Sequence, residues 1–420
     1  MLTLARARAH AVVVILIFVA VYAFGLIRHD GMIDGFGHVI GGDLLSVRSA
    51  AAIVLDGRGA ELYDFSVQAA YQQAAVAPQK LPGVNPFVSP PFVAVLCAPW
   101  TLLPFAPALV LWTALLHACL VAALMVMSRA APLTGRQLPS MLLLSLSFYP
   151  VLEGLMAGSN SLFELPIFAL MLPALRSGHE ARAGVLLGLQ LYRPQLALVP
   201  LVVFAVKRRW RILAGFAGVG AVWVLLSLLV APRSLLDWLA LGPLLSRMIF
   251  EKGMPSALFA SVYALFLLPL GPEHFAMAMA AGALVSLALL ALLLGVWMGP
   301  WDPGGEPFDL RFAALLLVAP LVSQYLQLHD FALLILPALV VAEYRLAHPA
   351  PEERRLVSRV LAVVWIACLV GPPIVSRVVP LPLAPLAAML LGWVVLRAWR
   401  AAAPPLPARR RARFRGPWLG

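Results

Sequence analysis

Long apolar runs recur from one end of the chain to the other, and few polar residues interrupt them. A helix needs about 20 consecutive apolar residues to cross the ~30 Å hydrocarbon core of a bilayer. Most of the runs reach or approach that length, so the pattern predicts an all-α, polytopic integral membrane protein with about ten full crossings. The predicted crossings are residues 11–27, 92–128, 138–156, 159–175, 211–230, 275–298, 310–327, 329–344, 357–371 and 381–399.

Two further apolar segments are predicted to enter the membrane without crossing it as one continuous helix. Residues 183–206 are interrupted at Arg193-Pro194, which favours two half-helices that meet at a break. Residues 257–271 are short and contain Pro269, so we expect a re-entrant or partial helix there. Broken backbone is tolerated at membrane depth only where it lines a protein cavity, so the first break marks a candidate site.

Composition supports a single membrane-embedded unit. Of the 420 residues, 62% are hydrophobic and 12% are charged, and the mean hydropathy is +0.92. Soluble domains carry about 25% charged residues, so no soluble fold of this size could bury so much apolar surface. We therefore expect one transmembrane domain over residues 1–420. The cysteines Cys97, Cys119 and Cys368 lie far apart in apolar segments, which predicts packing residues and neither a metal site nor disulfides.

The net charge of +12 lies largely in short basic clusters between apolar segments, which indicates contact with anionic membrane lipids and not with nucleic acid. The positive-inside rule places these clusters, both termini and the basic tail at residues 401–420 in the cytoplasm. Loop 28–88 and a second loop at residues 232–256 then lie outside. Residues 11–27 resemble a signal peptide without a cleavage site and are expected to be a retained anchor. Abundant alanine, proline and arginine favour a GC-rich bacterial genome, and therefore a bacterial plasma membrane.

Loop 28–88 is the longest predicted segment between crossings, and it is rich in acidic residues in a chain that has only 19. Long ordered loops are more often functional than connecting. The loop is expected to contain amphipathic helices, the first from about Leu44 to Leu55, with Asp43 at its N-cap and Gly57 near its C-cap. Capping alone would explain the aspartate. The alternative is a general base at the membrane surface, where partial burial raises the basicity of a carboxylate.

Arg193 is the most informative ionisable residue, because a guanidinium at a break within the membrane is costly unless an anion meets it. That anion is either a structural carboxylate, such as Glu153 or Glu164, or a ligand. His329 and Asp330 stand at the outer start of a predicted helix, where they form a local pair, cap the helix or act in a site. An outside carboxylate, an arginine and a histidine together suit an anionic, phosphate-bearing lipid.

A series of short motifs stands in order along the chain: Asp43, GAELYD at 59–64, SPPF at 89–92, GSNSL at 158–162, Arg193-Pro194-Gln195, Arg208-Arg209-Trp210 and VSQYLQLHDF at 322–331. This series resembles glycosyltransferase family 87, a group of GT-C-type enzymes that depend on polyprenyl-phosphate sugars. Arginine at position 193 replaces the lysine that is usual in the family, which turns a point charge into a planar fork. The last motif has its histidine in place but lacks the family's proline and tryptophan.

The resemblance implies a GT-C-like fold with loop 28–88 as the catalytic loop outside the cytoplasm. It implies inverting transfer of a sugar, mannose or similar, from a polyprenyl-phosphate donor to a lipid-linked or glycan acceptor at the outer face. In this scheme Asp43 removes the acceptor proton, Arg193 and His329 bind the donor phosphate, and neither a metal nor another cofactor is needed. Further candidates for substrate binding are Tyr63, Asp64, Asn160, Gln195, Tyr325 and Asp330.

Two other functions are compatible with the residues alone. A transporter or flippase could bind an anionic lipid-linked substrate at the broken helix 183–206. We find no inverted repeat, however, and the acidic residues cluster in one loop instead of along a spanning path. A non-catalytic scaffold for envelope-synthesis enzymes would leave Asp43 as a simple helix cap.

Overall fold

The computed structural model describes residues 3–242, 259–324, 326–348, 350–371 and 381–402. Within these ranges the regular structure is helical, and the only β-type pairings are isolated bridges. The predicted all-α class is confirmed for the described residues. The single-domain assignment stays a prediction. The cytoplasmic tail also stays a prediction, because the last described helix ends at Ala402 and residues 403–420 lie outside the described ranges.

Five described helices are long and apolar enough to cross a membrane. Helices α7 (Leu138–Leu146) and α8 (Tyr149–Ala157) are bent by 64° relative to each other and add a sixth span if they count as one. The protein is thus a multi-pass membrane protein whose described residues are all-helical and contain five or six candidate spans, and the prediction of about ten is wrong. The five are α1 (Leu4–Ile27), α5 (Phe105–Ala130), α12 (Trp210–Val230), α16 (Phe275–Trp297) and α21 (Leu383–Ala402).

The overcount arises because burial inside the protein produces the same apolar sequence as exposure to lipid. Helix α17 (Glu306–Leu321) has 16 residues, and nearly all of those from Phe308 onward are buried by other helices. Helices α9 (Glu164–Arg176) and α18 (Ile335–Ala347) have 13 residues each, about 20 Å at 1.5 Å per residue. Helix α19 (Pro351–Val370) begins with charged residues that shorten its apolar part.

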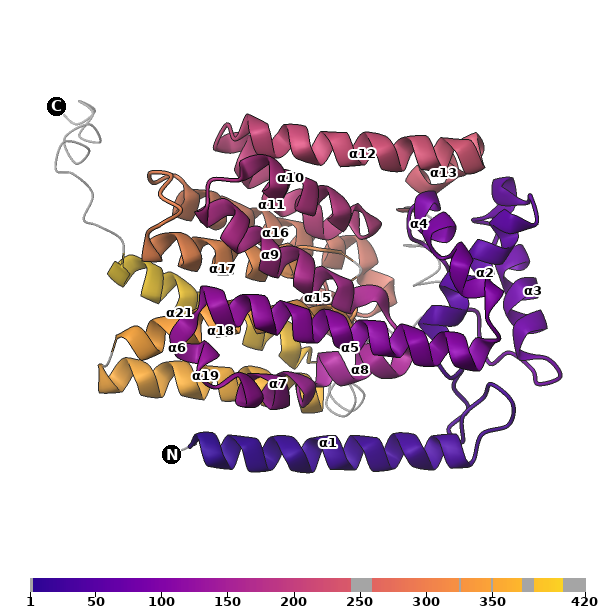
Figure 1. Cartoon of the computed structure of the whole chain (residues 1–420), viewed down its shortest axis with the longest axis horizontal. Coiled ribbons are helices and arrows are strands. Elements are labelled where there is room, and N and C mark those ends of the chain that lie inside the picture. The colour runs from indigo at the N-terminus through magenta and orange to yellow at the C-terminus, as the bar shows by residue number, and fades with distance from the viewer. Residues whose placement is uncertain (1–2, 243–258, 325, 349, 372–380, 403–420) are drawn as a thin grey trace.

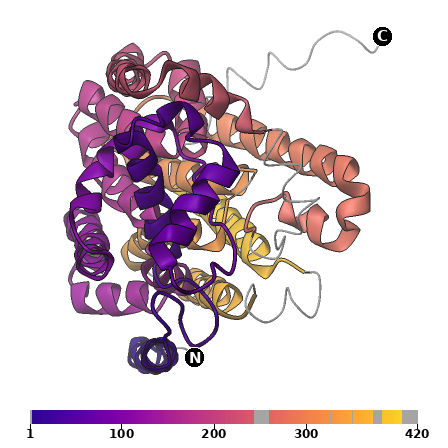
Figure 2. The ribbon, with the colours of Figure 1, turned by 90° about the vertical axis from the view of Figure 1, so that its right-hand side faces the viewer.

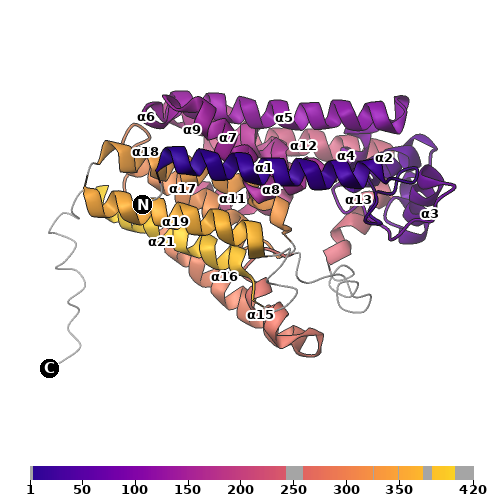
Figure 3. The ribbon, with the colours of Figure 1, turned by 90° about the horizontal axis from the view of Figure 1, so that it is seen from below.

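Helices α1, α5 and α12 run along the longest axis of the molecule, whereas α16 is inclined to it (Figures 1 and 3). Helices α1 and α12 lie on opposite sides of the bundle, and α5 lies opposite α16 (Figures 1, 2 and 3). Contacts tie α1 to the rest of the protein mainly through α7. The N-terminus is at one end of the bundle, and the helices of loop 28–88 are at the other (Figure 1).

The helices of that far end come from both predicted outside loops. Loop 28–88 contains α2 (Gly42–Leu55), the short η1 (Gly59–Glu61) and α3 (Phe65–Val76), so the expected helices are present. Helix α13 (Pro232–Leu239) joins them, and its Trp238 indole donates a hydrogen bond to the carbonyl of Val88 at 3.1 Å. Residues 243–256 of the second loop lie outside the described ranges.

The predicted break at Arg193 is confirmed. Helix α10 (Glu180–Leu189) passes through one turn, η4 (Gln190–Tyr192), and α11 (Pro194–Val206) begins with proline at its first position. A proline suits the first turn of a helix but pushes the preceding residue out of helical conformation. Arg193 accordingly has φ −132° and ψ 75°, outside the helical region.

The other short apolar segment also fails to form a long helix. Helix α15 (Ala264–Leu270) has only seven residues and contains Pro269. It is followed by Gly271 at φ +72°, a left-handed conformation that glycine adopts without strain. Seven residues span about 10 Å, so this segment does not cross a bilayer by itself. Residues 257 and 258 lie outside the described ranges.

Candidate functional site

Arg193 is surrounded by polar groups from two distant segments. Its guanidinium forms an ion pair with Asp330, donates from Nε to the side-chain oxygen of Asn160 at 2.9 Å and donates from Nη2 to the Ser159 hydroxyl at 3.2 Å. The side chains of Arg193 and Asp330 are 13% and 6% exposed, so the pair is buried. The structural partner of the arginine is therefore Asp330, whereas Glu164 acts on Arg193 only as a nearby charge.

His329 and Asp330 belong to η7 (Leu328–Leu334), the turn that leads into α18. The Asp330 carboxylate accepts from the backbone N–H of Gln327 at 3.0 Å, and the Gln327 side chain accepts in return, which forms a capping box. Nε2 of His329 lies 3.5 Å from Asp330. His329 is 5% exposed and interacts electrostatically with both Asp43 and Arg193. It therefore links the aspartate of the first loop to the broken helix.

Asp43 is not the N-cap of its helix, which corrects the prediction. The cap is Gly41 at φ +64°, and α2 begins one residue before Asp43. A side chain at Gly41 would collide with Leu109, so tight packing against α5 fixes where the helix starts. The Asp43 carboxylate is half-buried and accepts a hydrogen bond from the Asn85 amide at 2.7 Å. Capping no longer explains the aspartate, since its side chain bonds another segment instead of its own backbone.

The segment that contains Asn85 is held by two glutamines of α3. The amide of Gln72 accepts from the Asn85 N–H at 3.0 Å and donates to the Asn85 carbonyl at 2.7 Å. Gln68, one helical turn earlier, accepts from the Phe87 N–H at 2.8 Å and donates to the Phe87 carbonyl at 3.2 Å. Glutamines at i and i+4 share one helix face and so match residues i and i+2 of an extended chain. This glutamine clasp fixes the segment that orients Asp43.

Two further carboxyl groups, those of Glu153 and Glu164, lie at the site. The sequence indicates them only as structural partners of Arg193. Glu153 on α8 interacts electrostatically with Asp43, and its Oε2 is buried without a hydrogen-bond partner. Glu164 is fully buried at the start of α9, and neither of its oxygens has a hydrogen-bond partner. The sequence signal was present, because carboxyl groups in apolar segments are rare and are usually functional.

Three of the remaining sequence candidates, Tyr63, Asp64 and Gln195, form no hydrogen bond or ion pair with the residues of this cluster. Tyr63 is buried and donates to the carbonyl of Ser89 at 2.7 Å, and burial raises the pKa of its phenol. Asp64 is the exposed N-cap of α3, where the Ser66 hydroxyl and backbone hold the pKa of the carboxyl below its usual range. Gln195 is exposed in the first turn of α11. Tyr325 lies outside the described residues.

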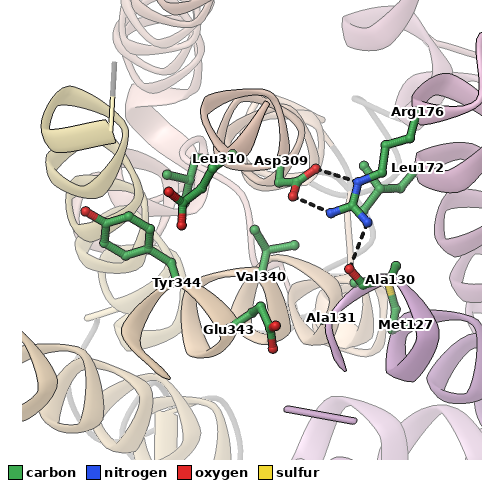
Figure 4. A pocket seen from close by; sticks show the side chains of 11 residues that line it. Met127, Ala130, Ala131, Leu172, Arg176, Asp309, Leu310, Val340, Glu343 and Tyr344 are labelled. Atoms are coloured by element: carbon green, nitrogen blue, oxygen red, sulfur yellow. Dashed lines mark hydrogen bonds and ion pairs between the residues drawn. The ribbon is translucent and has the colours of Figure 1, made fainter. Parts of the chain in front are cut away.

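A cavity of about 50 Å³ lies at the opposite end of the bundle and is not part of this cluster (Figure 4). Its polar groups already have partners. Arg176 forms an ion pair with Asp309 and donates to the Ala130 carbonyl at 2.8 Å. Glu343 accepts from the backbone N–H groups of Leu133 and Thr134 at 3.0 and 2.7 Å. These bonds hold the turn after α5 and give the cavity a structural role.

Replacing Arg176 with alanine should therefore destabilise the protein without affecting a reaction at the far end. The change removes a half-buried ion pair and leaves the Asp309 carboxylate without its cation, which should cost about 1–3 kcal/mol. Thermal unfolding in detergent measures the loss. Sugar transfer per folded molecule should stay at the wild-type level, and a large fall in that rate would contradict the structural role.

A comparison with known protein families matches residues 87–323, more than half of the chain, to glycosyltransferase family 87. The chain belongs to glycosyltransferase family 87. The resemblance of its motifs is thereby confirmed, and this glycosyltransferase is an enzyme with a sugar donor and an acceptor. No curated relative and no solved structure matches the chain, and the GT-C-like fold stays a prediction.

The matched range of the glycosyltransferase contains part of the cluster. Asn160, Arg193 and Glu153 lie inside it, whereas Asp43 precedes it and His329 follows it. The family match therefore does not include Asp43 and His329, and their roles are argued from their positions in the structure. The structure brings Asp43, His329 and Arg193 together from positions far apart in the sequence.

Proposed function

We propose that this glycosyltransferase moves a sugar, mannose or a similar one, from a polyprenyl-phosphate donor to a hydroxyl group of a lipid-linked or glycan acceptor. The observation that carries the proposal is the buried position of His329, which lies 3.5 Å from Asp330, the ion-pair partner of Arg193, and is also influenced by the charge of Asp43. A carboxylate base and a cationic group near the same histidine suit attack at an anomeric carbon that carries a phosphate leaving group.

In the proposed reaction the acceptor oxygen attacks the anomeric carbon while the bond from that carbon to the phosphate oxygen breaks. The acceptor proton passes to Asp43, and the polyprenyl phosphate leaves with the bonding electron pair. Asn85 occupies Oδ1 of Asp43 and so aims the other carboxylate oxygen at the acceptor. Attack opposite the leaving group inverts the anomeric configuration.

Arg193 and His329 would stabilise the departing phosphate. A guanidinium has five N–H donors, and Asp330, Asn160 and Ser159 occupy three of them. Two donors therefore stay available to phosphate oxygens while the ion pair holds the group in place. Arginine in place of lysine suits this arrangement, because a planar fork binds a carboxylate and a phosphate at once.

The proposed location is the outer face of a bacterial plasma membrane, with both termini in the cytoplasm. The basic clusters between the apolar helices support this orientation. The end of the bundle that carries loop 28–88 is the end opposite the N-terminus, as a catalytic loop outside would require (Figure 1). Family membership argues against the transporter and scaffold alternatives.

The test is to incubate purified protein with radiolabelled polyprenyl-phosphate mannose and a bacterial lipid extract. A labelled product that is new on thin-layer chromatography supports the proposal. Labelled sugar nucleotide in place of the lipid donor is the control, and transfer from the nucleotide alone would refute the assigned donor class. Absence of a product from any polyprenyl-phosphate sugar would refute the proposed reaction.

A further inference from the structure

Two carboxyl groups among the described residues, Glu153 and Glu164, have buried oxygens without a hydrogen-bond or ion-pair partner. Glu164 at least lies near the Arg193 cation. The other buried carboxyl groups that the structure describes pair with a cation or with N–H donors, as their desolvation requires. Glu153 instead has a buried, unpartnered Oε2, and the charge that it faces is a second carboxylate, Asp43. The partnered carboxylates are Glu180 with Arg209, Asp309 with Arg176, Asp330 with Arg193 and Glu343 with the start of α6 (Pro132–Gly135).

This arrangement opposes folding. Like charges repel, and an unpaired carboxyl group loses its hydration when it is buried. Neither effect has a compensating contact among the described residues around Glu153. A residue that lowers stability and has a buried oxygen without a hydrogen-bond partner is typical of a site where a ligand supplies the missing partner.

The position of Glu153 indicates which part of the ligand it meets. Helix α8 packs against both α2, which carries Asp43, and η7, which carries His329. A side chain at the neighbouring Gly154 would lie 3.6 Å from the Cβ of His329, so this turn of α8 packs closely against His329. An inverting displacement places the acceptor oxygen and the phosphate on opposite sides of the anomeric carbon. The ring of the donor sugar therefore lies between Asp43 and the phosphate-binding residues.

We infer that Glu153 binds a ring hydroxyl group of the donor sugar and contributes to the choice of sugar, an inference that rests on the proposed function. A carboxyl oxygen is a strong acceptor for a hydroxyl group, and a site built around one such bond rejects a donor that lacks the hydroxyl. Glu153 thus acts as a specificity residue, and the proton of the acceptor still passes to Asp43.

The experiment compares the wild type with Glu153→Gln and Glu153→Leu on a set of polyprenyl-phosphate sugars, each lacking one ring hydroxyl group. For the intact donor, we expect kcat/KM to fall about 10- to 100-fold in the leucine variant and less in the glutamine variant, which keeps a hydrogen-bonding group. One deoxy donor should show a similar fall with the wild type but little further fall with Glu153→Leu, because both changes remove the same bond.

Thermal unfolding separates this role from a structural one. Both variants should unfold at the wild-type temperature or above it, because a repulsive and unpartnered group has been removed. Glu343→Gln is the matched control: it should lower the unfolding temperature and leave the ranking of the deoxy donors unchanged, since Glu343 holds backbone groups at the other end.

Three results would overturn the inference. The first is a kcat/KM of Glu153→Leu that equals that of the wild type for the intact donor. The second is a loss from the substitution that multiplies the loss from the missing hydroxyl group for every deoxy donor, which would mean that Glu153 bonds none of these hydroxyl groups. The third is a lower unfolding temperature in the glutamine variant with normal donor ranking, which would make Glu153 structural. These three leave the proposed function intact, whereas a wild-type protein that transfers no sugar from any polyprenyl phosphate overturns both proposals.

Discussion

Asp43→Asn should give a folded protein whose transfer rate is about 10²- to 10⁴-fold below that of the wild type. The amide has the shape of the carboxylate but cannot take a proton at neutral pH. The loss should appear in kcat, with KM for the donor little changed, because Asp43 acts on the acceptor proton. Initial rates with saturating donor measure the effect, and circular dichroism checks the fold.

Two companion variants make this result specific. Asn85→Ala keeps the carboxylate but removes the hydrogen bond that orients it, so we expect a smaller loss of about tenfold. Asp56→Asn is the matched control, because Asp56 is an acidic residue of the same loop that accepts a hydrogen bond from the Tyr71 hydroxyl, away from the cluster. Near-normal transfer by Asp43→Asn would rule out Asp43 as the base.

Arg193→Met should show the second large effect, because it removes both a fold-stabilising charge and a phosphate-binding group. The Asp330 carboxylate would stay buried without its cation, and breaking such a pair costs about 3–5 kcal/mol. The unfolding temperature and the transfer activity should both fall. Activity alone cannot separate the two causes, since a destabilised protein also loses activity.

The double variant Arg193→Met/Asp330→Asn separates these causes. Removing the second charge relieves the unpaired carboxylate, so much of the lost stability should return. Activity should stay low if the guanidinium also binds the donor phosphate. Arg193→Lys tests whether the planar guanidinium is needed, because lysine keeps the positive charge but donates its hydrogen bonds from a single nitrogen atom. Full recovery of transfer in the double variant would assign Arg193 a structural role only.

The features that the sequence predicted well are those decided by local chemistry. Pro194 makes the preceding residue non-helical wherever the chain lies, so the break at Arg193 followed from two adjacent residues. Gly57, at φ +74° just after α2, was predicted for the same kind of reason. The start of α2 was misplaced by a short distance because packing against Leu109, a distant residue, makes Gly41 the cap.

The features that the sequence missed depend on contacts between distant segments. Hydropathy cannot tell helix α17, buried by protein, from α12, whose surface is largely exposed for contact with lipid. The choice of Asp330 over Glu153 and Glu164 as partner of Arg193 depends on how η7 packs against η3 (Asn160–Phe163). The amide of Asn85 gave no sequence signal, since only the folded loop brings it to Asp43.

The glutamine clasp on α3 has a consequence for how this loop can vary between related enzymes. Gln68 and Gln72 form their hydrogen bonds with the backbone groups of Phe87 and Asn85 and not with the side chains of these residues. Substitutions at Phe87 that leave the peptide path intact are therefore compatible with the same orientation of the aspartate, whereas Asn85 must keep its amide to bond Asp43. A single residue inserted between the two clasped positions would break their match to one helical turn and would displace the Asn85 amide from its carboxylate. Apart from Asn85 itself, the length of this segment constrains it more than the identity of its side chains.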